Sequence, residues 1–158
     1  MLTIGDKAPL DLKLANETGE IFTLSDYLGK WVLVYFYPRD NTPGCTLEAE
    51  GFRDHLDEFK RCNTVVLGVS KDSCSSHQKF IEKKQLTFTL VADEEHALME
   101  AFGTWGERKF MGRTYMGTSR STFLIDPKGI VAHVWEQVKP AAHPEEVLAV
   151  IKEKHHGE

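Results

Sequence analysis

The sequence contains few cysteines, no excess of positive charge and no long apolar run. Its three cysteines, Cys45, Cys62 and Cys74, are odd in number and unevenly spaced, which does not fit a secreted disulfide framework and predicts a reducing, cytoplasmic location. The formal net charge of −5 argues against a nucleic-acid partner and against an anionic membrane surface. The longest apolar run, residues 31–37, is far shorter than the ~20 residues that cross a bilayer.

The sequence also lacks the short motifs of several cofactor and redox proteins. It has no Cys-x-x-Cys pair, so a thioredoxin-type disulfide reductase is not expected. No glycine-rich phosphate loop follows an expected strand, and Cys74 with His77 supplies too few ligands for a zinc site. We therefore expect neither a metal ion nor an organic cofactor. The first residues show no basic stretch followed by an apolar one, so no signal or transit peptide is expected.

The hydrophobic pattern predicts an α/β fold in one domain, residues 1–158. With 41% apolar and 27% charged residues the chain can bury a core, and its length suits a single domain. The apolar run at 31–37 is rich in β-branched and aromatic residues, which is typical of a strand buried on both faces. Strands alternate with helical patterns along the chain, which indicates a central mixed sheet flanked by helices.

Turn signals predict a β-hairpin near each end of the chain. The polar break at 16–19 separates two short apolar segments, which predicts an N-terminal β-hairpin. The sequence Asp126-Pro127-Lys128-Gly129 separates two β-rich runs and predicts a second hairpin, which adds an antiparallel edge to the sheet. The strands expected from these patterns after the N-terminal hairpin are 31–37, 64–69, 88–91, 121–125 and 130–135.

Helices are expected where apolar residues recur at helical spacing. One stripe predicts a single helix over residues 45–59; its members are Cys45, Ala49, Phe52, Leu56 and Phe59. Further helices are expected from residue 72 or 73, between 93 and 102, and from 144. The segment 103–118 carries several large apolar residues without a clear period, and we expect a long loop there.

The segment from Pro38 to Cys45 joins the buried strand to the start of a helix. Thr42 is a favourable N-cap, and Pro43 suits the first helical position. Cys45 is then expected in the first turn, where unpaired backbone N–H groups and the helix dipole favour an anion such as a thiolate. A cysteine can also be a small buried apolar residue, but the order of strand, proline, Thr-Pro-Gly and cysteine favours a reactive thiol.

These residues resemble the peroxiredoxin signature Pro-x-x-x-Thr/Ser-x-x-Cys, which Pro38, Thr42 and Cys45 match. Within that family the chain resembles the bacterioferritin comigratory protein, or peroxiredoxin Q, subgroup over nearly its whole length. The other segments that carry the resemblance are 35–38, 51–54, 105–107, 110–112 and 120–126. The resemblance implies a thioredoxin-like fold and an antioxidant enzyme, a thiol peroxidase that reduces hydrogen peroxide and organic hydroperoxides.

By this resemblance the catalytic residues are Cys45, Thr42, Pro38 and Arg120. The Cys45 thiolate attacks the peroxide and becomes a sulfenic acid, while the Thr42 hydroxyl holds thiolate and peroxide in line and Pro38 shields the site. Arg120 supplies a fixed positive charge that stabilises the thiolate and the departing oxygen. Glu48 stands where the subgroup has Glu or Gln and either orients an arginine or is a solvated helix carboxylate.

The chain departs from the subgroup at the resolving cysteine, the second thiol that attacks the sulfenic acid. Many members carry it five residues after the first cysteine, where this chain has Glu50. Others carry it about 35 residues on, and Cys74 is the nearest candidate to that position. Cys62 is expected ~25 Å from Cys45 along an intact helix, which is too far for a disulfide unless the helix unfolds.

Two modes of recycling therefore remain open. The first is a one-cysteine enzyme whose sulfenic acid is reduced by thioredoxin, glutaredoxin or a small thiol, and the second is an atypical two-cysteine enzyme in which Cys74 resolves. A redox sensor or thiol-dependent binding protein of the same fold, without turnover, is the alternative from another functional class. Glu50 in place of a cysteine favours that alternative, whereas the complete catalytic set favours the peroxidase. The resemblance also implies a monomer.

Overall fold

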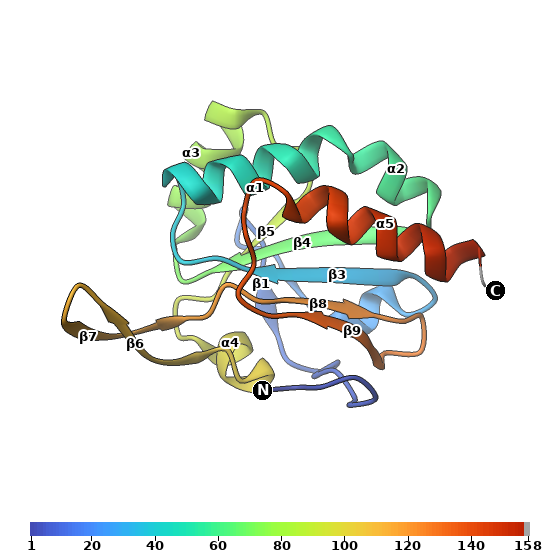
Figure 1. The fold of residues 1–158 in the computed structure, drawn as a ribbon, viewed down its shortest axis with the longest axis horizontal. Coiled ribbons are helices and arrows are strands. Elements are labelled where there is room, and N and C mark those ends of the chain that lie inside the picture. The colour runs from blue at the N-terminus through green and yellow to red at the C-terminus, as the bar shows by residue number, and fades with distance from the viewer. Residues whose placement is uncertain (157–158) are drawn as a thin grey trace.

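A mixed five-stranded sheet forms the centre of the computed structural model, which describes residues 1–156 (Figure 1). The strand order across the sheet is β5-β4-β3-β8-β9. Strands β3, β4 and β5 run parallel, and β8 and β9 join them antiparallel, as expected from the closing hairpin. The bounds are β3 (Trp31–Phe36), β4 (Thr64–Ser70), β5 (Thr89–Ala92), β8 (Thr122–Ile125) and β9 (Val131–Trp135).

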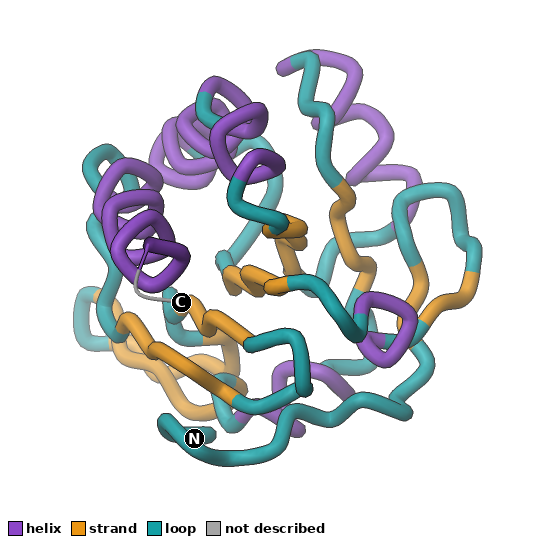
Figure 2. The backbone as a smooth tube through the Cα atoms, turned by 90° about the vertical axis from the view of Figure 1, so that its right-hand side faces the viewer, coloured by secondary structure: helices purple, strands orange, loops and turns teal. Residues whose placement is uncertain are grey.

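Helices cover both faces of this sheet. Figure 2 shows one group of helices over one face, while the N-terminal segment runs along the opposite side. The helices are α1 (Pro43–Asp54), α2 (Leu56–Arg61), α3 (Cys74–Lys84), α4 (Ala97–Phe102) and α5 (His143–His156), with a 3₁₀ helix η1 (Leu24–Tyr27). Helices α1, α2 and α5 contact one another, and α3 packs beside β5. None of the described helices is long and apolar enough to cross a membrane.

Strand β3 is buried on both faces, which explains its unbroken apolar sequence. Successive side chains of a strand point to opposite faces. Leu33 and Tyr35 accordingly belong to the core cluster that includes α1, α2 and α5, whereas Val34 and Phe36 belong to the cluster that includes α4. The strand therefore lies between the two core clusters, and the loop that leads to α1 leaves from its C-terminal end.

The predicted helix over 45–59 is two helices in the structure. Helix α1 ends at Asp54, and α2 begins at Leu56 after His55, whose φ of −102° and ψ of 7° interrupt the helical geometry. The apolar stripe nevertheless continues across the break, because all of its members are buried. The prediction of one continuous helix is wrong, but the predicted buried face is confirmed.

The expected long loop over 103–118 is a β-hairpin. Strands β6 (Trp105–Phe110) and β7 (Arg113–Thr118) pair along their whole length and project from the body of the protein (Figure 1). Met111 and Gly112 form the two-residue turn, with φ of 51° and 78°. Positive φ at both central residues is the geometry that suits a tight hairpin. Methionine rarely adopts it, which is why the pattern of residues did not indicate a turn here.

The N-terminal hairpin is present as predicted, with strands β1 (Leu14–Ala15) and β2 (Ile21–Phe22).

Asp93 caps a helix as predicted, although the helix begins four residues later than Asp93. Helix α4 begins at Ala97, and the Asp93 carboxylate accepts hydrogen bonds from the backbone N–H groups of Leu98 and Met99 at 3.0 and 2.9 Å.

Candidate active site

Cys45 lies in the first turn of α1, directly after the loop that follows β3. Thr42 is the N-cap, with φ of −87° and ψ of 156°, and Pro43 is the first helical residue, as the sequence predicts. The extended N-cap and the proline start the helix so that the backbone N–H groups of its first turn point toward the loop. Only 1% of Cys45 is exposed, so the thiol sits beneath the surface.

Arg120 reaches Cys45 from just before β8. Its Nη2 lies 3.1 Å from Cys45 Sγ, and its Nη1 lies 3.1 Å from Glu48 Oε1. The planar guanidinium can bind the sulfur and the carboxylate together because its N–H groups point in fixed directions. Two residues that sequence reasoning proposed for one site, Cys45 and Arg120, are thus brought into contact across 75 positions of sequence.

The segment between β9 and α5 closes the site from a third direction. The backbone N–H of Val138 donates to the carbonyl oxygen of Arg120 at 3.0 Å. A Cβ atom on Gly44 would lie 3.4 Å from Pro140 Cγ and 3.5 Å from Arg120 Nη2. Pro140 and Arg120 therefore both lie against the start of α1 at Gly44.

Glu48 is a buried carboxyl group beneath Arg120, and its side chain has no exposed surface. Burial raises its pKa to about 7, although the charge and the hydrogen bond of Arg120 act in the opposite direction. The choice that the sequence left open is thereby decided, because this residue is not solvated and it does contact Arg120. Its second oxygen, Oε2, has no hydrogen-bond partner among the described residues.

Tyr35 is a site neighbour that sequence reasoning missed. Its hydroxyl is buried without a partner among the described residues. Burial, followed by the charges of Glu48 and Cys45, raises the pKa of this phenol well above its ordinary value. The available signal was a tyrosine within an apolar run that predicts a fully buried strand, because a buried tyrosine hydroxyl usually lies near other polar groups.

Thr42 and Pro38 belong to the loop that leads to Cys45, but they make other contacts. The Thr42 hydroxyl donates to the carbonyl oxygen of Arg39 at 3.2 Å, so it is engaged with the backbone of the loop. Pro38 is exposed and lines a surface cavity of about 210 Å³. The other residues around that cavity are Arg39, Lys71, Met99, Trp105, Tyr115, Met116, Gly117 and Thr118.

The other two cysteines are placed apart from this contact, and all three are free thiols. Cys62 caps the C-terminal end of α2 and is 7% exposed, so it lies in the core at the opposite end of the α1–α2 run from Cys45. Cys74 is the first residue of α3, and its Sγ donates to the carbonyl oxygen of Asn16 at 3.3 Å. Among the described residues, no group of three or more His, Cys, Asp or Glu is arranged to hold a metal ion.

Comparisons with known proteins match nearly the whole chain. The model of the AhpC/TSA family matches residues 4–134. Peroxiredoxin Bcp of Bacillus subtilis is 49% identical over 152 residues, which are 96% of each chain, and peroxiredoxin Bcp of Escherichia coli K12 is 47% identical, covering 96% of this chain and 97% of the relative. A structure of Xanthomonas campestris peroxiredoxin Q has a TM-score of 0.88 at 42% identity and covers 92% of both chains.

Proposed function

Because the chain belongs to the AhpC/TSA family of peroxiredoxins and is a thiol peroxidase of the Bcp and peroxiredoxin Q group, we propose that Cys45 is the residue that peroxide oxidises. The observation that carries this proposal is the 3.1 Å contact between Arg120 Nη2 and Cys45 Sγ in the first turn of α1. The guanidinium and the N-terminus of α1 both place positive electrostatic potential at the sulfur, and the thiolate is the form of a cysteine that attacks as a nucleophile.

The proposed reaction transfers one oxygen atom to sulfur. The Cys45 thiolate attacks the nearer oxygen of ROOH, the O–O bond breaks, and the products are Cys45–SOH and RO⁻, which takes up a proton to become ROH. Arg120 stabilises the negative charge that develops on the departing oxygen. Thr42, after rotation of its hydroxyl away from Arg39, aligns the peroxide, and Pro38 limits the approach of water to the loop.

Both hydrogen peroxide and organic hydroperoxides are proposed as substrates. One similar structure, at 40% identity and a TM-score of 0.88, is described as giving insight into the alkyl peroxide reduction activity of the Xanthomonas campestris bacterioferritin comigratory protein. In this chain the cavity beside Pro38 offers the apolar side chains of Trp105, Tyr115 and Met116 to an alkyl group. Hydrogen peroxide has no apolar part to bury, so these side chains would contribute to the binding of an organic hydroperoxide only.

The proposed mechanism uses Cys45 alone, with an external thiol as reductant. The thiol attacks the sulfenic acid, water leaves, and a second thiol then releases the reduced enzyme as a disulfide of the reductant forms. Two observations support a mechanism without a resolving cysteine: Cys62 is buried in the core, and the Cys74 thiol donates to the Asn16 carbonyl oxygen. Thioredoxin, glutaredoxin or a small thiol in the cytoplasm fits this role, with the enzyme acting as a monomer; resolution by Cys74 is the alternative.

The test is the intact mass of the protein after one equivalent of hydrogen peroxide, with and without a sulfenic-acid trap. A trap adduct on Cys45, absent in Cys45→Ser and retained in Cys62→Ser, is expected. A loss of two hydrogens, with a peptide joining Cys45 to Cys74, would replace the one-cysteine mechanism by the two-cysteine one. Full peroxide consumption by Cys45→Ser would refute the assignment of Cys45.

A further inference from the structure

Asp40, in the loop between β3 and α1, forms a buried ion pair with His77 of α3. His77 Nδ1 lies 2.7 Å from Asp40 Oδ2, and the two side chains are 0% and 4% exposed. The other ring nitrogen, Nε2, lies 2.8 Å from the carbonyl oxygen of Val91 in β5. The pair therefore joins three segments of the chain at a site that is almost fully buried.

Both ring nitrogens of His77 face oxygen atoms that can accept hydrogen bonds, so the geometry favours the imidazolium form. A neutral imidazole has one N–H and would turn a lone pair toward either the Asp40 carboxylate or the Val91 carbonyl. Burial alone lowers the pKa of His77, but the hydrogen bond and charge of Asp40, the Val91 carbonyl and the charge of Asp72 outweigh it and raise the pKa above 6.5.

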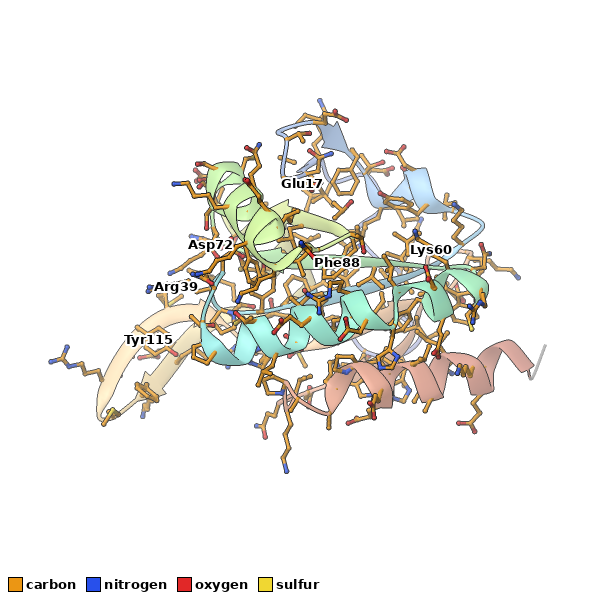
Figure 3. The ribbon with its side chains drawn as sticks, turned by 90° about the horizontal axis from the view of Figure 1, so that it is seen from above. Glu17, Arg39, Lys60, Asp72, Phe88 and Tyr115 are labelled. Carbon is orange, nitrogen blue, oxygen red and sulfur yellow. The ribbon has the colours of Figure 1, made fainter. Side chains whose placement is uncertain are left out.

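The same carboxylate anchors the loop that leads to Cys45. Asp40 Oδ1 accepts from the Tyr37 hydroxyl at 2.6 Å, and Oδ2 also accepts from the Ser76 hydroxyl at 2.8 Å. The backbone N–H of Asp40 donates to Asp72 Oδ2 at 2.7 Å. Figure 3 shows Arg39 and Asp72 near each other where α1 and α3 begin. Lys79 and Lys83 line a surface cavity together with Asp40, but among the described residues His77 is the cation that forms an ion pair with the Asp40 carboxylate.

Asp40 stands two residues after Pro38 and two before Thr42, in the middle of the proposed catalytic loop. We propose that His77 is a positioning residue for the peroxide step: its imidazolium holds this loop against α3, and loss of its proton releases the loop and slows the oxidation of Cys45. The inference rests on the proposed role of Cys45. Its physical basis is that small displacements of reacting groups carry large penalties in rate, on the order of 100-fold for about 1 Å.

The unmodified enzyme provides the first test. The rate of Cys45 oxidation by hydrogen peroxide is measured by stopped flow from pH 6 to pH 10. The His77 ring is titrated by NMR in protein with labelled histidine, and the His77 signal is the one that disappears in His77→Gln. The competent form is the protonated one, so the rate is expected to fall as pH rises through the pKa of His77. Two midpoints that coincide, both above 6.5, support the inference. A reactive enzyme with a flat alkaline profile overturns the inference alone, whereas no oxidation of Cys45 at any pH overturns the proposed function with it.

A pair of variants separates the charge from the hydrogen bonding. His77→Gln is expected to oxidise at least about tenfold more slowly at pH 7 and to show no alkaline loss. Ser76→Ala removes a neutral donor to the same Asp40 oxygen, and it is expected to keep the alkaline loss. A buried Asp40 without its cation can prevent folding, so the double variant Asp40→Asn/His77→Gln, which removes both charges, is measured as well. It is also expected to lack the alkaline loss of rate. Retention of that loss in either variant without His77 overturns the proposal.

Discussion

Replacement of Glu48 by glutamine is expected to stabilise the protein above pH 7 and to leave its stability nearly unchanged at pH 4. The Glu48 side chain has no exposed surface, and burial raises its pKa from 4.5 to about 7. Above that pH the enzyme must hold a carboxylate in its interior. Glutamine has almost the same shape, can still accept from Arg120 Nη1, and never ionises.

The magnitude follows from the difference between the folded and unfolded pKa values. The value of about 7 in the folded protein and 4.5 in the unfolded chain differ by about 2.5 pKa units. At 1.36 kcal/mol per unit, this corresponds to about 3 kcal/mol of folding free energy. Because the folded pKa is the higher one, this stability is fully present below pH 4.5 and is lost as pH rises through about 7.

Urea unfolding of the parent and of Glu48→Gln between pH 4 and pH 9 measures the effect. The difference in unfolding free energy is expected to grow from near zero to about 3 kcal/mol, or roughly 6–12 °C in melting temperature. His143 has the opposite effect, because burial lowers its pKa to about 4 and its contribution to stability is lost as pH falls from 6.5 through 4. This contribution is the same in both proteins, so it cancels in the difference.

Glu50→Gln serves as the control for the change in net charge, since Glu50 lies on the same helix and is partly exposed. A difference between parent and Glu48→Gln that does not change with pH would refute the reasoning. A variant less stable than the parent at pH 8 would show instead that the ion pair with Arg120 outweighs the burial of the carboxylate.

Two further substitutions probe the site and its support. Arg120→Lys keeps the charge but loses the planar group that contacts both Cys45 and Glu48. The stopped-flow rate of Cys45 oxidation is therefore expected to fall roughly 10²- to 10³-fold. A rate within twofold of the parent would contradict this role. Gly51→Ala places a methyl group 2.6 Å from Pro144 Cγ and is expected to lower the unfolding free energy by about 1–3 kcal/mol. A gain of about 1 kcal/mol in denaturant unfolding, the value of the better helix propensity of alanine, would show that α5 moves aside without cost.

Local patterns predicted most of the fold and the position of Cys45 in the first turn of a helix. The apolar run of β3 indicated burial on both faces, and the Thr42-Pro43 pair indicated where α1 begins; both are confirmed. The same patterns failed at 103–118, where exposed and charged residues form the β6–β7 hairpin around a Met-Gly turn. A hairpin that projects from the body buries little, so it leaves no strong apolar alternation to detect.

The sequence by itself determined that a cysteine stands in the first turn of a helix after a buried strand, because capping and apolar period depend on neighbouring residues. It also matched the peroxiredoxin signature with Pro38, Thr42 and Cys45. Only the tertiary structure decided that Arg120 contacts Cys45 and Glu48, and that Asp40 pairs with His77. These contacts join segments far apart in the chain, and the degree of burial that shifts the pKa values of Glu48 and His77 exists only after those segments have packed together.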